Sequence, residues 1–264
     1  MIPISGTTRW MAIIADPVEQ AKTPLWMNEL IQSKELDAVL VPMHVKAADL
    51  KSCIQALKSV QNFAGAVISM PHKNAVVPML DVMTAEVHWT GACNVICRNR
   101  DGTLSGTLLD GDGFVAGLRQ REFDAKDKRV LLLGAGGAAS GIAFAMAKHG
   151  VASLHIRNRT ASKAELLTKK LKLRFPAVNF QCGPYNDQDF DLVINATRLG
   201  MYEDDMLPLS EKFLQPHMWV ADVVVTQEMT PLLQVAQQKG CPIHGGKWML
   251  ETQLEQMLAF MLDQ

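Results

Sequence analysis

Residues 129–139 read Arg-Val-Leu-Leu-Leu-Gly-Ala-Gly-Gly-Ala-Ala, and this stretch carries the clearest structural signal of the chain. An apolar run typical of a buried strand ends in the pattern Gly134-x-Gly136-x-x-Ala139, and a helix-like run of small residues follows at once. A strand, a tight turn and a helix start in this order form the pyrophosphate-binding unit of Rossmann folds. Gly134 permits the turn, Gly136 lets the backbone approach a phosphate, and N–H groups at the helix start favour negative charge. We therefore predict a dinucleotide site at Gly134, Ala135, Gly136, Gly137 and Ala138.

The composition is that of an ordinary globular chain. Of the 264 residues, 48% are hydrophobic and 20% are charged, and the net charge is −1. Acidic and basic residues are interspersed, which argues against a nucleic-acid or anionic-membrane partner. No apolar run approaches the ~18 residues of a membrane span, and the first nine residues lack the layout of a signal peptide. We expect a cytoplasmic monomer or homodimer that binds neither nucleic acid nor membrane.

The five cysteines indicate neither a disulfide framework nor a metal site. Their number is odd and their spacing is irregular, which is typical of a reducing compartment. Cys93 and Cys97 lie close together in a β-rich run, but no second Cys or His pair follows at zinc spacing. We expect both thiols to pack in the core and no metal to bind.

Strand and helix signals alternate along most of the chain. Before residue 100, strands are expected over 10–15, 38–45 and 65–70, helices over 24–33 and 47–60, and a further helix from about Asn74. An Asp-Gly turn at 101–102 between two β-rich runs predicts an antiparallel hairpin. After the glycine-rich unit, strands are expected over 153–156, 178–182, 191–196 and 220–225, with helices between them and a final helix over 248–262. This order predicts an α/β protein of two domains: an N-terminal domain with a mixed sheet, over residues 1–111, and a Rossmann-type domain, over residues 112–242.

The second strand–helix unit of the Rossmann-type domain indicates which dinucleotide binds. An NAD enzyme usually carries Asp or Glu at the end of this strand, where the acid binds the ribose hydroxyls. Residues 151–164 contain no acid, and Arg157, Arg159 and Lys163 surround the expected ribose position. Such cations can pair with a 2′-phosphate, so NADP is favoured, with NAD as the alternative. Ordinary solvated basic residues at a helix start would give the same pattern.

Two polar residues of the first domain lie where open α/β sheets bind their ligands. Lys73 follows the third strand, and a lysine there can exchange a proton with a substrate oxygen if its surroundings adjust its pKa. Asp110 ends the hairpin, where it can orient a neighbouring ammonium or hydroxyl group. The alternatives are a solvated lysine at a helix start and a carboxylate that caps a helix. His72 is expected to be structural, because strand alternation points it away from Lys73.

Together these motifs resemble the shikimate dehydrogenase family over nearly the whole chain. The matching segments follow in the family's order: Asp16 to Pro24 with Asn28, Ser69-Met-Pro-His-Lys73, Gly91-Ala-Cys-Asn94, Leu109-Asp-Gly111, Gly134 to Ala139, Asn158-Arg-Thr160, Asn195-Ala-Thr-Arg-Leu-Gly-Met201, Thr230-Pro-Leu-Leu233 and Gly246-Lys-Trp-Met-Leu-Glu-Thr-Gln253. The resemblance implies an NADP-dependent enzyme of aromatic amino acid biosynthesis. Hydride would pass between nicotinamide and a substrate carbon, while Lys73 and Asp110 shuttle the proton.

The resemblance also implies binding residues for a small cyclic hydroxy acid and for the cofactor. Asn94 and Gln253 would bond substrate hydroxyls, Ser69 stands in place of a usual threonine, and Thr23 in place of a serine. Beyond the glycine-rich turn, the residues expected to bind the cofactor are Asn158, Arg159, Thr160, Lys163, Thr197 and Gly246. A C-terminal helix over 243–264, which carries Gln253, would return to complete the first domain.

The chain departs from the family pattern around the substrate. Two serines that hold the substrate carboxylate in typical members become Ala21 and Thr23, and further substrate positions become Val67, Leu108 and Val225. A lost hydrogen bond to a charged group costs ~1.5–3 kcal/mol, so shikimate itself is expected to be a poor substrate.

Three functions are consistent with the sequence. The first is an NADP-dependent oxidoreductase that acts on a shikimate- or quinate-like ring. The second is the same chemistry on an aminated or more apolar cyclic alcohol. The third is a nucleotide-binding protein without turnover, against which the retention of Lys73, Asp110, Asn94 and Gln253 counts.

Overall fold

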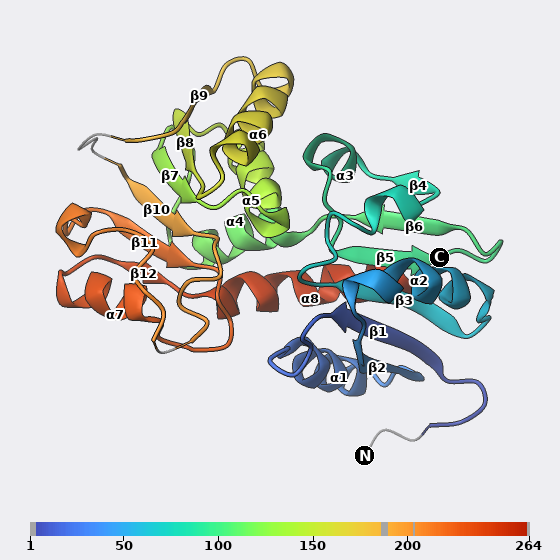
Figure 1. The fold of residues 1–264 in the computed structure, drawn as a ribbon. Coiled ribbons are helices and arrows are strands. Elements are labelled where there is room, and N and C mark those ends of the chain that lie inside the picture. Colours follow the sequence, from blue (N-terminus) through green and yellow to red (C-terminus); the bar gives the residue numbers. More distant parts are fainter. Residues whose placement is uncertain (1–3, 186–189, 203, 263–264) are drawn as a thin grey trace. The chain divides into compact units, whose positions relative to one another are not determined.

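The computed structural model describes residues 4–185, 190–202 and 204–262, and Figure 1 shows their arrangement along the chain. The chain forms two compact units. Unit 1 holds the residues up to Leu109 and those from Gln253 onward, whereas unit 2 is Asp110–Thr252. The sequence places the boundaries instead after residue 111 and before residue 243.

Unit 1 is built on a mixed sheet of six strands in the order β2-β1-β3-β5-β6-β4. Its strands are β1 (Arg9–Ala15), β2 (Ala38–His44), β3 (Phe63–Ile68), β4 (Val82–Met83), β5 (Val95–Arg98) and β6 (Leu104–Thr107). The first three run parallel, and β5 runs antiparallel to both β3 and β6. The mixed sheet and the hairpin are confirmed. Gly102, at φ +84°, supplies the left-handed residue that the hairpin turn needs.

Short helices cover this sheet, as the apolar spacing predicts. They are α1 (Thr23–Ser33), the 3-10 turn η1 (Ala47–Asp49), α2 (Leu50–Ser59), the 3-10 turn η2 (Val77–Met79) and α3 (Ala85–Thr90). Helix α2 buries Leu50, Ile54 and Leu57, one turn apart, in the same core as Phe63 of β3. Burial of this apolar stripe holds the helix on the sheet.

The helix predicted from about Asn74 is wrong. The residues after Met70 form turns that lead into η2, and the next α-helix is α3. Pro78 lacks a backbone N–H and its ring clashes with the preceding turn of a helix, so a regular helix cannot pass through it. The Asn74 side chain instead donates to the Gly91 carbonyl, at 2.7 Å, and ties the segment to the end of α3.

Unit 2 is built on a parallel sheet in the order β12-β11-β10-β7-β8-β9 (Figure 1). Its strands are β7 (Arg129–Leu133), β8 (Ser153–Arg157), β9 (Asn179–Cys182), β10 (Leu192–Asn195), β11 (Trp219–Asp222) and β12 (Ile243–His244). Its helices are α4 (Asp110–Gln120), α5 (Gly137–Lys148), α6 (Ala161–Arg174), the 3-10 turn η3 (Glu211–Phe213) and α7 (Pro231–Gln238). The α/β class with a Rossmann-type second sheet is confirmed.

Helix α8 (Gly246–Leu262) ends the described chain; it begins two residues before the start at 248 expected from apolar spacing and three residues after the start at 243 that the resemblance implies. Residues 243 and 244 belong to β12, because Pro242 and the glycines at 245 and 246 bracket two residues that pair with β11. In unit 1, Met261 packs so close to Gly65 that an added Cβ would lie 2.9 Å from its Cγ. Residues 263 and 264 of the predicted helix lie outside the described residues. Among the described helices, none is both long and apolar enough to cross a membrane.

Candidate functional site

The glycine-rich turn of unit 2 combines one crowded glycine with one open glycine. Gly134 has φ +120°, and an added Cβ would lie 2.6 Å from the Ala196 carbonyl oxygen. Gly136 is the N-cap of α5, and a Cβ there would meet nothing within 4 Å. The N–H groups of the first helical turn have no partners inside the helix. The open space before α5 therefore fits a dinucleotide pyrophosphate.

The basic segment after β8 lies at the same edge of the sheet. Gly134 donates its N–H to the Arg157 carbonyl, at 2.7 Å, so the two turns are neighbours. The Asn158 side chain donates to the Thr160 carbonyl, at 2.9 Å, and Thr160 is the N-cap of α6. Arg159 and Lys163 are exposed at this helix start. Their charges and the helix dipole both favour an anion here.

Thr197 and Gly246 complete the set of predicted cofactor residues. Thr197 follows β10, where its hydroxyl donates to Asn195 Oδ1 at 2.7 Å. Gly246 follows β12, and an added Cβ would lie 2.5 Å from the Val224 carbonyl oxygen. All the predicted cofactor residues thus follow the carboxyl ends of strands in one parallel sheet, where open α/β sheets bind ligands.

In unit 1, Asn94 joins three segments at one edge of the mixed sheet. Its side-chain Oδ1 accepts from the Leu109 N–H at 2.8 Å, and its Nδ2 donates to Gln253 Oε1 at 3.1 Å. The preceding Cys93 donates its N–H to the Lys73 carbonyl at 2.8 Å. Asn94 and Gln253 are each only 1% exposed. The backbone at Lys73, the side chains of Asn94 and Gln253, and the residue before Asp110 are therefore brought together.

Other predicted substrate residues are more loosely linked to this cluster. Ser69, just after β3, donates its N–H to the Ile14 carbonyl at 2.9 Å. Thr23 is buried at the start of α1, which packs on β2, and in the sheet order β1 and β3 separate β2 from β5. His72 is fully buried, with its Nε2 2.7 Å from the Val45 carbonyl oxygen, as expected of a structural residue.

Each of the two units contains a segment that matches a known protein-family model. The family model described as "Shikimate dehydrogenase substrate binding domain" matches residues 13–96, and "Shikimate / quinate 5-dehydrogenase" matches residues 117–207. The chain belongs to the shikimate dehydrogenase family. It is thus an oxidoreductase of this family, as the sequence resemblance predicts.

Individual relatives agree with this membership. A shikimate dehydrogenase (NADP(+)) of Lysinibacillus sphaericus is 34% identical over 93% of this chain and 89% of its own length. A solved shikimate dehydrogenase in complex with NADP+ has a TM-score of 0.91 and 29% identity, over 99% of this chain and 92% of that one. A ligand-free 5-ketofructose reductase of Gluconobacter sp. strain CHM43 has a TM-score of 0.86 and 28% identity, over 98% and 95%. This architecture therefore serves proteins named for different substrates.

Three of the positions at which this family member departs from the pattern are buried, and Thr23 is one of them. Val67 is 5% exposed and Leu108 is 2% exposed. Each side chain is packed in unit 1. Val225, in unit 2, is half-buried.

Two thiols, that of Cys93 just before β5 and that of Cys97 within β5, are buried packing groups. Cys93 donates to the Val95 carbonyl at 3.2 Å, and Cys97 lies 3.7 Å from the Met261 carbonyl oxygen. Burial raises the pKa of the Cys97 thiol to about 11, which keeps it protonated. Within residues 4–185, 190–202 and 204–262, no group of three or more His, Cys, Asp and Glu side chains is arranged to hold a metal ion.

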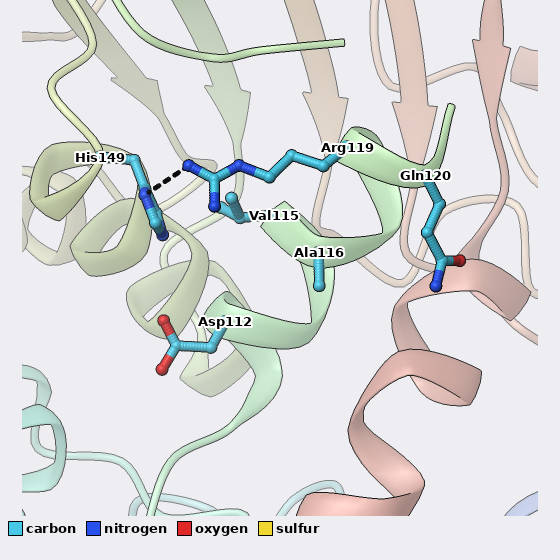
Figure 2. Close-up of a pocket in the computed structure, with 6 residues that line it drawn as sticks. All are labelled: Asp112, Val115, Ala116, Arg119, Gln120 and His149. Carbon is cyan, nitrogen blue, oxygen red and sulfur yellow. Dashed lines mark hydrogen bonds between the residues drawn. The ribbon is translucent and has the colours of Figure 1, made fainter. Parts of the chain in front are cut away.

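An open pocket on unit 2 contains none of the predicted site residues. Figure 2 shows its lining, which is Asp112, Val115, Ala116, Arg119, Gln120 and His149. Arg119 donates to His149 Nδ1 at 3.2 Å. Burial and the Arg119 charge lower the pKa of His149, which favours the neutral ring that can accept this bond. The pocket lies on α4 and the end of α5 and is not the candidate site.

Sequence reasoning missed two buried titratable residues of unit 2. Asp222, at the end of β11, has no exposed surface, and burial raises the pKa of its carboxyl to about 6. His244, in β12, is also fully buried, and its ring meets Phe114 edge-on at 5.3 Å between centroids. Among the described residues, neither ring nitrogen of His244 has a hydrogen-bond partner. In the sequence, Asp222 and His244 each stand as a polar residue inside an apolar strand pattern, and this pattern is the signal that could have revealed them.

The neutral state of His244 makes the protein sensitive to acid. Burial, with a smaller repulsion from Arg121, lowers the pKa of His244 to about 4 from 6.5. Below pH 6.5 the His244 ring binds a proton in the unfolded chain but not in the folded protein. The unfolding free energy therefore falls as the pH drops from 6.5 towards 4. We expect His244→Leu to reduce the fall in unfolding free energy between pH 6.5 and pH 4.5 by about 2 kcal/mol.

Urea unfolding of both proteins at the two pH values measures this difference. The raised pKa of Asp222 acts in the opposite direction, because its protonated form is favoured in the folded state. That contribution is present in both proteins and cancels in the comparison. An equal loss of stability in wild type and His244→Leu would contradict the prediction.

Proposed function

We propose that the chain catalyses NADP-dependent hydride transfer at a ring hydroxyl or ketone of a shikimate- or quinate-like cyclic substrate. The observation that carries this proposal is the set of bonds around Asn94, which links the residues of the substrate segments at one sheet edge. Family membership supports the reaction class. We further propose that the chain acts in the cytoplasm as a monomer or homodimer, with no nucleic-acid or membrane partner.

Lys73 and Asp110 carry the proton chemistry in this proposal. Lys73 gives a proton to, or takes one from, the reacting substrate oxygen, while the Asp110 carboxylate holds and orients that ammonium group. Asp110 directly follows Leu109, whose N–H is bonded to Asn94, and Asp110 itself is 2% exposed. Burial of Asp110 keeps water from its carboxylate, which strengthens the electrostatic interactions of that group.

Asn94 and Gln253 orient the substrate through its other hydroxyls. Asn94 donates to Gln253 Oε1, which fixes the Gln253 amide and leaves its Nε2 group as the donor towards a ligand. Ser69 and Thr23 add hydroxyl groups to the same proposed substrate set. A polar set that contacts several hydroxyls of one ring holds the reacting carbon in a defined position.

The cofactor residues proposed for NADP are those at the carboxyl edge of the parallel sheet. Bound nicotinamide supplies the acceptor or donor of hydride. The turn at Gly134, Ala135, Gly136, Gly137 and Ala138 would hold the pyrophosphate, while Asn158, Arg159, Thr160 and Lys163 would hold the adenosine 2′-phosphate. Thr197 and Gly246 would border the rest of the dinucleotide.

Removal of the cations at the α6 start is expected to change cofactor preference. We expect Arg159→Ala and Lys163→Ala each to raise the KM for NADP+ roughly ten- to a hundredfold and to leave the KM for NAD+ nearly unchanged, because only NADP+ carries the 2′-phosphate. Initial rates with each cofactor measure the effect. Lys172→Ala, at the far end of α6, is the matched control. Equal changes for both cofactors would show that neither cation reads the phosphate.

A second candidate is the same chemistry on a different cyclic alcohol, aminated or more apolar. The observation that favours it is Ala21, which offers no side-chain hydrogen bond where the family pattern has a serine. The similarity to a 5-ketofructose reductase supports the idea that substrate choice varies within this architecture. Relative rates on a panel of cyclic alcohols with and without a carboxylate separate the two candidates.

A further inference from the structure

Three strand ends form one row at the carboxyl edge of the parallel sheet. Asn195 of β10 pairs with Leu133 of β7 on one side and with Asp222 of β11 on the other. Leu133 is the residue before the crowded Gly134 turn. Asp222 therefore lies two strands away from the glycine-rich turn, in the same row.

The Asp222 carboxylate accepts three hydrogen bonds in a site without solvent access. Its Oδ1 accepts from Asn195 Nδ2 at 3.1 Å and from the Val224 N–H at 3.0 Å. Its Oδ2 accepts from the Thr230 hydroxyl at 2.8 Å. Asp222 and Asn195 are both 0% exposed. One buried side chain thus connects β10, the segment after β11 and the start of α7.

These bonds reach the loop that borders the glycine-rich turn and the segment that borders Gly246. Asn195 Oδ1 accepts from both the N–H and the hydroxyl of Thr197, at 3.1 and 2.7 Å. The intervening Ala196 carbonyl is the group that leaves no room for a side chain at Gly134. On the other side, the carbonyls of Val223 and Val224 lie against Gly246 in the same way.

We propose that Asp222 is a positioning residue for the dinucleotide, one that holds the loop carrying Thr197 beside the glycine-rich turn and the segment after β11 beside Gly246. The inference rests on the proposed NADP-dependent function. It extends that function because Asp222 has no exposed surface and acts only through the residues that it bonds.

An amide at position 222 cannot reproduce all three bonds in their present direction. The Thr230 hydroxyl already accepts from the Leu233 N–H, at 3.3 Å, and gives its own proton to Asp222 Oδ2. In Asp222→Asn, the NH2 group would replace the oxygen that accepts from the Thr230 hydroxyl, so the Thr230 proton would lose this acceptor and the bond could form only in the reverse direction. The exact loop positions are therefore expected to be lost, although the side chain keeps its shape.

The test compares Asp222→Asn with Asp191→Asn. Asp191 lies at the opposite end of β10, where its carboxylate accepts from the Arg129 N–H at 2.7 Å. We expect Asp222→Asn to raise the Kd of NADP+, measured by isothermal titration calorimetry, about tenfold or more. The KM for NADP+ should rise with it, while the KM for the alcohol changes less than about twofold. Asp191→Asn should leave the Kd unchanged.

A folded Asp222→Asn protein with wild-type NADP+ affinity would overturn the inference. If that variant does not fold, Thr230→Val and Thr230→Ser decide the question, because valine removes the hydroxyl donated to Asp222 and serine keeps it. A raised Kd in Thr230→Val that serine restores supports the inference, and equal Kd values for both overturn it. Failure of the wild-type chain to bind NADP+ would instead reject the proposed function.

Discussion

Replacement of Lys73 by alanine is expected to lower kcat by roughly a hundred- to ten-thousandfold, the usual contribution of a positioned general acid or base. In the proposed reaction a proton must move at the substrate oxygen when hydride moves at carbon. Without the Lys73 ammonium, charge would develop on that oxygen without a partner. Steady-state rates at saturating cofactor and substrate measure the loss.

The same variant should bind NADP+ normally, because the proposed cofactor residues all belong to unit 2 and Lys73 belongs to unit 1. Lys51→Ala, an exposed lysine on α2, is the matched control and should keep full activity. Retention of wild-type kcat by Lys73→Ala would remove the residue from the mechanism.

Gly136→Val is expected to weaken NADP+ binding by at least about a hundredfold without loss of stability. The backbone at Gly136 has φ −85° and ψ −171°, which any residue adopts, and an added Cβ meets no protein atom within 4 Å. The valine side chain would instead occupy the space proposed for the pyrophosphate. Loss of two or more charge-assisted hydrogen bonds, each worth ~1.5–3 kcal/mol, accounts for the size of the effect.

Gly134→Ala is the contrasting variant, because it strains the folded protein itself. Gly134 has a positive φ, and the added Cβ would lie 2.6 Å from the Ala196 carbonyl oxygen. We therefore expect the variant to lose about 1–3 kcal/mol in unfolding free energy. Calorimetric Kd values and urea unfolding of both variants separate binding from stability. Normal NADP+ affinity in Gly136→Val would show that no phosphate group lies before α5.

The parts of the fold that sequence predicted are those that local pattern specifies. The glycine-rich turn and the hairpin are short segments whose conformation depends on residues such as Gly134 and Gly102 themselves. The helix expected from Asn74 does not form because Pro78 interrupts the segment. The bond between Asn94 and Gln253 joins residues 159 positions apart, so no local pattern reveals it.

Local sequence patterns likewise do not reveal the buried polar network of unit 2. Asp222 and Asn195 stand in apolar strand patterns, and only the register that aligns β11 with β10 makes them neighbours. Family resemblance named Thr197 and Gly246 as cofactor residues, whereas the structure indicates what holds their loops. Single acids inside apolar runs therefore merit attention before a structure is known.

Initial rates with NADP+ and with NAD+ against shikimate, quinate and carboxylate-free cyclic analogues test the proposed NADP-dependent activity. We predict turnover of at least one cyclic alcohol, faster with NADP+ than with NAD+, and lowered at least about a hundredfold by Lys73→Ala. Tight binding of NADP+ without turnover of any alcohol in the panel, in either direction, would contradict the claim.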